Sequence, residues 1–148
     1  MRSGQRGFKL THLLIVVALA AILAVAIGVP SYQGMAMRDK VTAMINVAAA
    51  CKASVAKYYQ AHGVFPGNET QAGCSSEGAE DVRAPKVGAM GEVTVSAAGT
   101  LATQIKGGVF GFKPMTAGAG QPITAWACSA ALGAPTTIEQ KYLPAACR

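Results

Sequence analysis

The sequence holds few of the residues from which catalytic and metal-binding sites are built. It contains two histidines, His12 and His62, so no set of nucleophile, base and orienting residue can be read from it. The four cysteines form no C-x-x-C pair, which argues against a zinc site. Phosphate-binding loops and dinucleotide fingerprints are also missing. We therefore expect no catalytic residue, no metal ligand and no cofactor, and a protein that is not an enzyme.

The charges are too few and too dispersed to mark a dedicated nucleic-acid surface. The formal net charge is +6, and no run of basic residues is interleaved with aromatic ones. A chain of 148 residues has material for one folded core and little more.

Polar side chains are absent from one stretch, residues 13–29. Its length of about 17 residues is the lower limit for a membrane-spanning helix, and the mostly neutral continuation to Met37 makes a single crossing plausible. Arg2 and Arg6 precede the stretch, where positive charge favours the cytoplasmic side. All four cysteines follow it, and an even number of cysteines beyond an export signal suggests disulfides in an oxidising compartment.

Three interpretations of residues 1–30 are open at this point. The first is a secretory signal peptide, cleaved after the small residues Ala24 and Ala26 to release a soluble domain that begins near Ile27. The second is a membrane anchor that is never cleaved. The third is a short basic leader that ends at Gly7 and is removed in front of the hydrophobic segment.

The segment MRSGQRG, followed by FKLTHLLIVVALAAILAVAIGVPSYQ, resembles the N-terminus of type IV pilins. The resemblance implies that a prepilin peptidase cleaves between Gly7 and Phe8 and that the new N-terminal Phe8 is N-methylated. It divides the chain into a leader at residues 1–7, a hydrophobic transmembrane and assembly helix at 8–37, and a globular head at 38–148.

The resemblance has departures at the residues expected to govern assembly. His12 stands where the family usually carries glutamate, which is thought to neutralise the N-terminal amine of a neighbouring subunit. Lys9 adds a further positive charge beside it, and Pro30 falls one residue later than usual. We take Lys9, His12 and Pro30 as the assembly residues, and the departure at His12 raises a minor or tip pilin as the alternative to a major one.

The pattern beyond Pro30 remains helical. We expect a helix from about Phe8 to His62, roughly 80 Å long, which ends at Gly63 and Pro66. Its apolar side comprises Val41, Met44, Ile45, Ala48, Cys51, Val55, Tyr58 and Tyr59, and its polar side Asp39, Thr42, Asn46, Lys57 and Gln60.

Residues 63–91 read as an irregular loop, and strands are expected at 92–97, 101–105, 109–114 and 123–128. The fold class is α+β and similar to the pilin fold. In it, a long N-terminal helix with a protruding hydrophobic half packs on a four-stranded antiparallel sheet. The protruding half needs lipid or partner subunits.

Four cysteines allow three pairings, and the local one, Cys51–Cys74 with Cys128–Cys147, suits this architecture best. Trp126-Ala127-Cys128, with the C-terminal run from Tyr142 to Arg148, resembles the disulfide loop of type IVa pilins. Pseudopilins of type II secretion usually lack that loop.

The function that these features favour is that of a structural subunit of a type IV pilus, which serves adhesion, twitching motility and DNA uptake. The alternatives are a minor or tip pilin whose head binds DNA or a surface ligand, and a type II secretion pseudopilin. The expected partners are other copies or other pilins, the prepilin peptidase, the inner-membrane assembly platform and membrane lipid, with weak DNA or host-surface binding. The chain is expected in the inner membrane before assembly and in the extracellular fibre afterwards.

Overall fold

The computed structural model describes residues 10–148, apart from the side chains of residues 29–31. The predicted cleavage residues Gly7 and Phe8, together with Lys9, lie outside the described residues. The chain divides into two compact units, Met1–Ala36 and Met37–Arg148, and each is described by itself below.

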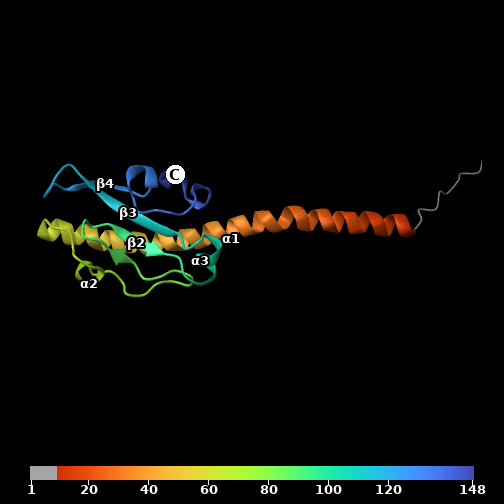
Figure 1. The fold of residues 1–148 in the computed structure, drawn as a ribbon, viewed down its shortest axis with the longest axis horizontal. Helices are drawn as coiled ribbons and strands as arrows, with labels where there is room; N and C mark the ends of the chain where they lie inside the picture. The colour runs from red at the N-terminus through yellow and green to blue at the C-terminus, as the bar shows by residue number, and fades with distance from the viewer. Residues whose placement is uncertain (1–9) are drawn as a thin grey trace, which may run out of the picture. The chain divides into compact units, whose positions relative to one another are not determined.

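The long helix α1 extends from Leu10 to His62 over 53 residues (Figure 1). Its C-terminal end is the one that the sequence predicts. Gly63 takes a left-handed φ of 71°, and its amide donates to the carbonyl of Tyr59. A residue without a Cβ adopts this conformation at little cost, so the helix ends there. Pro30 lies within α1.

The globular unit contains one four-stranded antiparallel sheet in the order β1-β2-β3-β4. The strands are β1 (Lys86–Val87), β2 (Val93–Ser96), β3 (Val109–Thr116) and β4 (Ile123–Ala127). In β2, Val93 and Val95 pair with Phe112 and Phe110 of β3, and all four side chains are buried. Between β3 and β4 the register is irregular at Met115/Thr116. The predicted α+β class with four antiparallel strands is confirmed.

One predicted strand is wrong. Residues 101–105 belong mostly to the short helix α3 (Gly99–Gln104), and the fourth strand is instead β1, inside the segment expected to be an irregular loop. Leu101 is fully buried, and the apolar Ile105 follows four residues later, a spacing that places both on one face of a helix. The expected loop also contains the short helix α2 (Glu69–Ala72).

The core of the globular unit lies between α1 and the sheet. In α1 the buried side chains recur every three or four residues, as Val41, Met44, Ala48, Cys51, Val55 and Tyr59. This is the apolar side that the periodicity predicts, while Ile45 and Tyr58 are half-buried at its margin. The residues predicted for the polar side, Asp39, Thr42, Asn46, Lys57 and Gln60, are all exposed.

The C-terminal segment after β4 has no long element and consists of turns and three 3₁₀ helices, Ala130–Leu132, Gln140–Tyr142 and Ala145–Cys147. Two consecutive threonines fasten it beside the first half of β3. The Thr136 hydroxyl accepts from the Gly111 amide and lies 2.8 Å from the Cys128 carbonyl, while the Thr137 amide donates to the Val109 carbonyl. The segment thereby satisfies backbone groups of β3 that β4 does not reach. No sequence pattern predicts this role.

Candidate assembly surface

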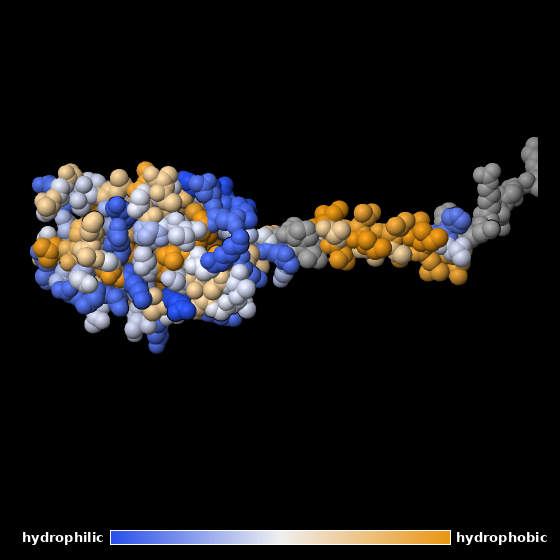
Figure 2. Space-filling model, viewed as in Figure 1, coloured by the Kyte–Doolittle hydropathy of each residue, from blue (hydrophilic) through white to orange (hydrophobic). Residues whose placement is uncertain are grey.

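The N-terminal part of α1 exposes apolar side chains all around its circumference. These side chains have exposed fractions between 51% and 74%: Leu10, Leu13, Leu14, Ile15, Val16, Val17, Leu19, Ile22, Leu23, Val25 and Ile27. Figure 2 shows this part of the helix almost uniformly hydrophobic, whereas the globular unit presents a mixed surface. An apolar surface of this extent marks a region that contacts lipid or other protein chains.

This segment also satisfies the length and composition of a membrane-crossing helix. Its most apolar 18-residue window has a mean hydropathy of 2.9, and none of that window is buried. The core helix of a soluble protein would have the same composition but would be mostly buried. Small residues at Ala18, Ala20, Ala21, Ala24, Ala26 and Gly28 leave room for the close approach of another helix.

His12 lies in the first turn of α1, where its side chain is exposed. This turn contains no acidic residue, although negative charge would favour the helix N-terminus. Of the predicted assembly residues, His12 is the one whose side chain the structure describes, since Lys9 and the side chain of Pro30 lie outside the described residues.

The globular unit contains two disulfides, Cys51–Cys74 and Cys128–Cys147. No described cysteine is free. This is the pairing that the sequence analysis favoured. The first bridge holds the segment after α2 against α1, and the second closes the C-terminal loop beside the sheet. The Cα–Cα distances are 4.8 Å and 5.0 Å, which lie in the usual range for disulfides.

Trp126 is half-buried and packs into the core through aromatic and cationic contacts. Its ring meets that of Phe112 edge to face at 6.5 Å, and Lys52 Nζ lies 4.4 Å from the Phe112 centroid and 6.0 Å from that of Trp126. A lysine over aromatic faces is stabilised by the ring electrons while its methylene stem covers apolar surface. These contacts give Trp126 a structural role at the margin of the core.

A polar cluster that the sequence analysis missed joins three segments of the globular unit. Lys40 Nζ of α1 lies 2.6 Å from Asp81 Oδ2 and donates to the Thr100 hydroxyl over 3.1 Å. The Thr100 hydroxyl and amide both donate to the Asp81 carboxylate, over 2.8 Å and 3.1 Å. The hydrogen bond from Lys40, followed by that from Thr100, holds the pKa of the Asp81 carboxyl below its usual value. No sequence motif predicts this cluster, because its members are about 20 and 40 residues apart.

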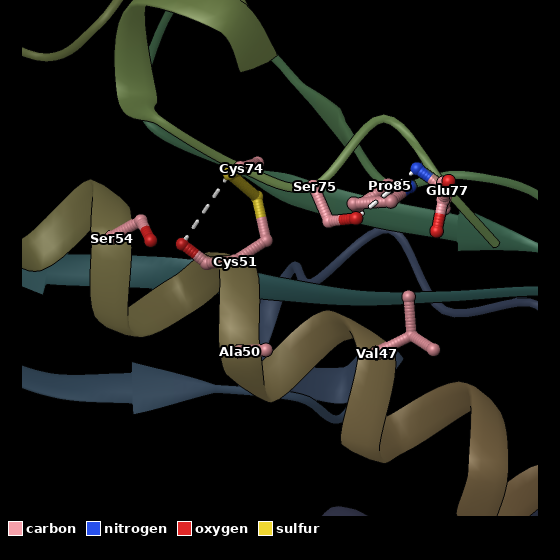
Figure 3. A pocket seen from close by; sticks show the side chains of 8 residues that line it. All are labelled: Val47, Ala50, Cys51, Ser54, Cys74, Ser75, Glu77 and Pro85. Carbon is pink, nitrogen blue, oxygen red and sulfur yellow. Dashed lines mark hydrogen bonds between the residues drawn. A yellow bond between two sulfur atoms is a disulfide. The ribbon is translucent and has the colours of Figure 1, made fainter. Parts of the chain in front are cut away.

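A small cavity of about 250 Å³ lies beside the Cys51–Cys74 bridge (Figure 3). It is lined mainly by apolar atoms of α1 and of residues 74–85, with the hydroxyls of Ser54 and Ser75 and the carboxylate of Glu77 as its polar groups. Ser75 Oγ accepts from the Glu77 amide over 3.1 Å. These lining residues form no pair of nucleophile and base within the part of the chain that the structure describes.

Comparison with known proteins agrees with this arrangement. The family described as pilin (bacterial filament) matches residues 38–148. The fimbrial protein EcpC of Eikenella corrodens is 33% identical, in an alignment that covers 100% of this chain and 94% of the relative. The type IV major pilin protein PilE1 of Neisseria gonorrhoeae is 36% identical, with 100% and 89% covered. A fimbrial protein of Neisseria meningitidis serogroup B is 42% identical over 51% of this chain and 44% of the relative.

The family match covers the globular unit, and two of these alignments extend over the whole chain, including the apolar helix. The long helix on a four-stranded antiparallel sheet is the architecture expected of that family. The chain therefore belongs to the type IV pilin family.

Proposed function

We propose that this chain is a structural subunit of a type IV pilus, in which the apolar halves of many α1 helices pack together. The proposal rests on the exposed apolar surface of α1 between Leu10 and Ile27. In water such a surface is unfavourable at about 25 cal/mol per Å² of apolar area, so it needs lipid or neighbouring helices. The fimbrial and major-pilin names of its relatives support the same assignment.

The proposed life of the chain has two stages. Before assembly the apolar helix at residues 8–37 crosses the inner membrane, with Arg2 and Arg6 on the cytoplasmic side. A prepilin peptidase then removes residues 1–7, Phe8 is N-methylated, and the assembly platform moves the subunit into the extracellular fibre. The partners are therefore lipid first and other pilins afterwards, and the chain has no catalytic function.

The direct test is intact-mass analysis of filaments sheared from cells that express the chain. The expected product begins at N-methylated Phe8 and has 148 − 7 = 141 residues. A mature chain that begins near Ile27 would overturn the proposal, because signal peptidase would then have removed the helix that carries it.

A second candidate, a minor or tip pilin whose head binds DNA or a surface ligand, is favoured by His12. At the tip no subunit lies above, so the missing carboxylate matters less there. Abundance separates the two candidates. A major subunit dominates the protein of sheared filaments, whereas a minor or tip subunit is a trace component of filaments built from another pilin.

We expect His12 to weaken self-assembly. Phe8, Lys9 and His12 are close together in the sequence, and none of them offers a carboxylate to the N-terminal amine of a neighbouring subunit. The positive charges of that amine and of Lys9 repel each other strongly in a water-poor helix bundle. His12→Glu should supply the missing carboxylate and raise the filament yield.

The matched control is His62→Gln, at the other end of α1, where the ring stacks on Tyr58 at 4.1 Å. This variant should give the filament yield of the parent chain. Equal filament yields from the parent and His12→Glu would show that His12 does not affect assembly.

A further inference from the structure

The cluster of Lys40, Asp81 and Thr100 lies where neither disulfide restrains the chain. The bridges close the rings 51–74 and 128–147, and everything between Cys74 and Cys128 is held by noncovalent contacts alone. Within that stretch, residues 78–84 and α3 are not part of any strand of the four-stranded sheet. They are joined to it at the isolated bridge between Val82 and Ala97 and by the Arg83 amide, which donates to the Ser96 carbonyl.

Helix α3 cannot form by itself. It has six residues, fewer than an isolated helix needs to be stable in water, and its N-cap residue, Ala98, has no side chain that could accept a hydrogen bond. Asp81 supplies the missing cap from a distant part of the chain. Its carboxylate accepts from the Thr100 amide, and its backbone carbonyl accepts from the Ala98 amide over 2.7 Å.

Asp81 is itself held in a backbone conformation that costs free energy. Its φ is 60°, in the left-handed region that non-glycine residues rarely adopt, and it lies in a tight turn closed by two hydrogen bonds between Ala79 and Val82. Gly99 faces it with a φ of 51°, and a Cβ at Gly99 would overlap Asp81 Oδ1. The turn and the helix are therefore in close contact at Asp81 and Gly99.

The cluster is partly accessible to solvent, unlike the core beneath it. The exposed fractions of the Lys40 and Asp81 side chains are 39% and 15%, whereas Leu101 of α3 and Val82 of the turn are buried. A partly exposed ion pair is screened by salt and can exchange its hydrogen bonds for bonds to water. The polar contacts can thus break before the sheet does, and their loss would expose the two buried apolar residues.

We propose that Lys40, Asp81 and Thr100 form a releasable latch, whose opening frees residues 78–84 and α3 as one local unit while β2, β3 and β4 stay folded. Local units of this kind open independently of global unfolding and are detected by amide hydrogen exchange. Such an opening would take place within a single chain and would not require filament formation.

The test is hydrogen exchange of the full chain in detergent micelles, comparing the parent with Asp81→Asn. Asparagine tolerates the left-handed conformation, so this variant removes the charge and leaves the turn geometry possible. We expect exchange of residues 78–84 and 98–104 to accelerate by about tenfold or more, with β2, β3 and β4 changing less than about twofold.

Two further variants keep the test decisive. Lys40→Met retains the apolar stem but removes the cation, and should accelerate the same two segments even if Asp81→Asn fails to fold. Glu80→Gln removes one negative charge from the adjacent residue, which makes no ion pair among the described residues, and should leave the exchange unchanged. Acceleration of the whole sheet together with these segments, or no acceleration in either latch variant, would overturn the latch. Neither result depends on whether the chain forms pili.

Discussion

Replacing Gly7 with valine is expected to leave the leader attached and to abolish the appearance of the chain in surface filaments. Glycine allows a protease to approach the backbone closely, and a β-branched side chain at the same place obstructs that approach. The uncleaved chain keeps Arg2 and Arg6 at the end of the apolar helix. Because charged side chains are costly inside the bilayer, this leader also holds the helix in the membrane.

The measurement is intact mass of membrane and sheared-filament fractions from cells that express each variant. Gly7→Val should be found at the mass of the full 148-residue chain, in the membrane fraction alone. Ser3→Val, a matched change within the leader but away from the junction, should be processed normally. Processed Gly7→Val in the filaments would show that the cleavage site lies elsewhere.

Loss of the Cys128–Cys147 bridge should strongly lower the stability of the head. The bridge joins residues 19 positions apart, and removing a native disulfide from a small exported domain typically costs about 2–5 kcal/mol. The loop that it closes buries Ile138 and Leu143 against the core, with 5% and 3% of their surface exposed. In the unfolded state the open loop gains conformational freedom, so that these contacts are more easily lost.

Urea unfolding of the full chain in micelles, under oxidising conditions, measures this effect. The double variant Cys128→Ser/Cys147→Ser avoids a reactive free thiol and should lower the unfolding midpoint accordingly. Ala131→Ser, at an exposed position of the same loop, should change the free energy of unfolding by less than about 0.5 kcal/mol. An unchanged midpoint in the double variant would mean that the Thr136–Thr137 contacts with β3 hold the loop without the bridge.

The long helix could be predicted because its signals are local in the sequence. Apolar residues repeat at helical spacing from Val41 to Tyr59, and a glycine follows directly after His62. The apolar run from residue 13 to 29 likewise identifies the part of α1 whose surface is incompatible with water, since this depends on composition alone. Alternating apolar residues and β-branched residues predicted β2, β3 and β4. The predicted ends of these strands lie within two residues of the ends in the structure.

The wrongly predicted strand at residues 101–105 shows that local sequence signals carry no information about distant contacts. Residues 101–105 have β-branched and apolar side chains typical of a strand, yet Asp81, about 20 residues earlier, caps them as a helix. The strand β1 has only two residues, too few for a period to be visible, and it exists because Lys86 and Val87 pair with β2. In both places a distant partner outweighs local propensity.

The sequence by itself determined which part of this protein is apolar, where the long helix ends, and which cysteines are near each other along the chain. These properties follow from side-chain chemistry and short-range geometry. Only the tertiary structure decided that Asp81 joins Lys40 to Thr100 and that Thr136 and Thr137 complete β3. Those contacts form because folding brings together groups that are far apart in the sequence, and the buried backbone groups of β3 need partners where water is excluded.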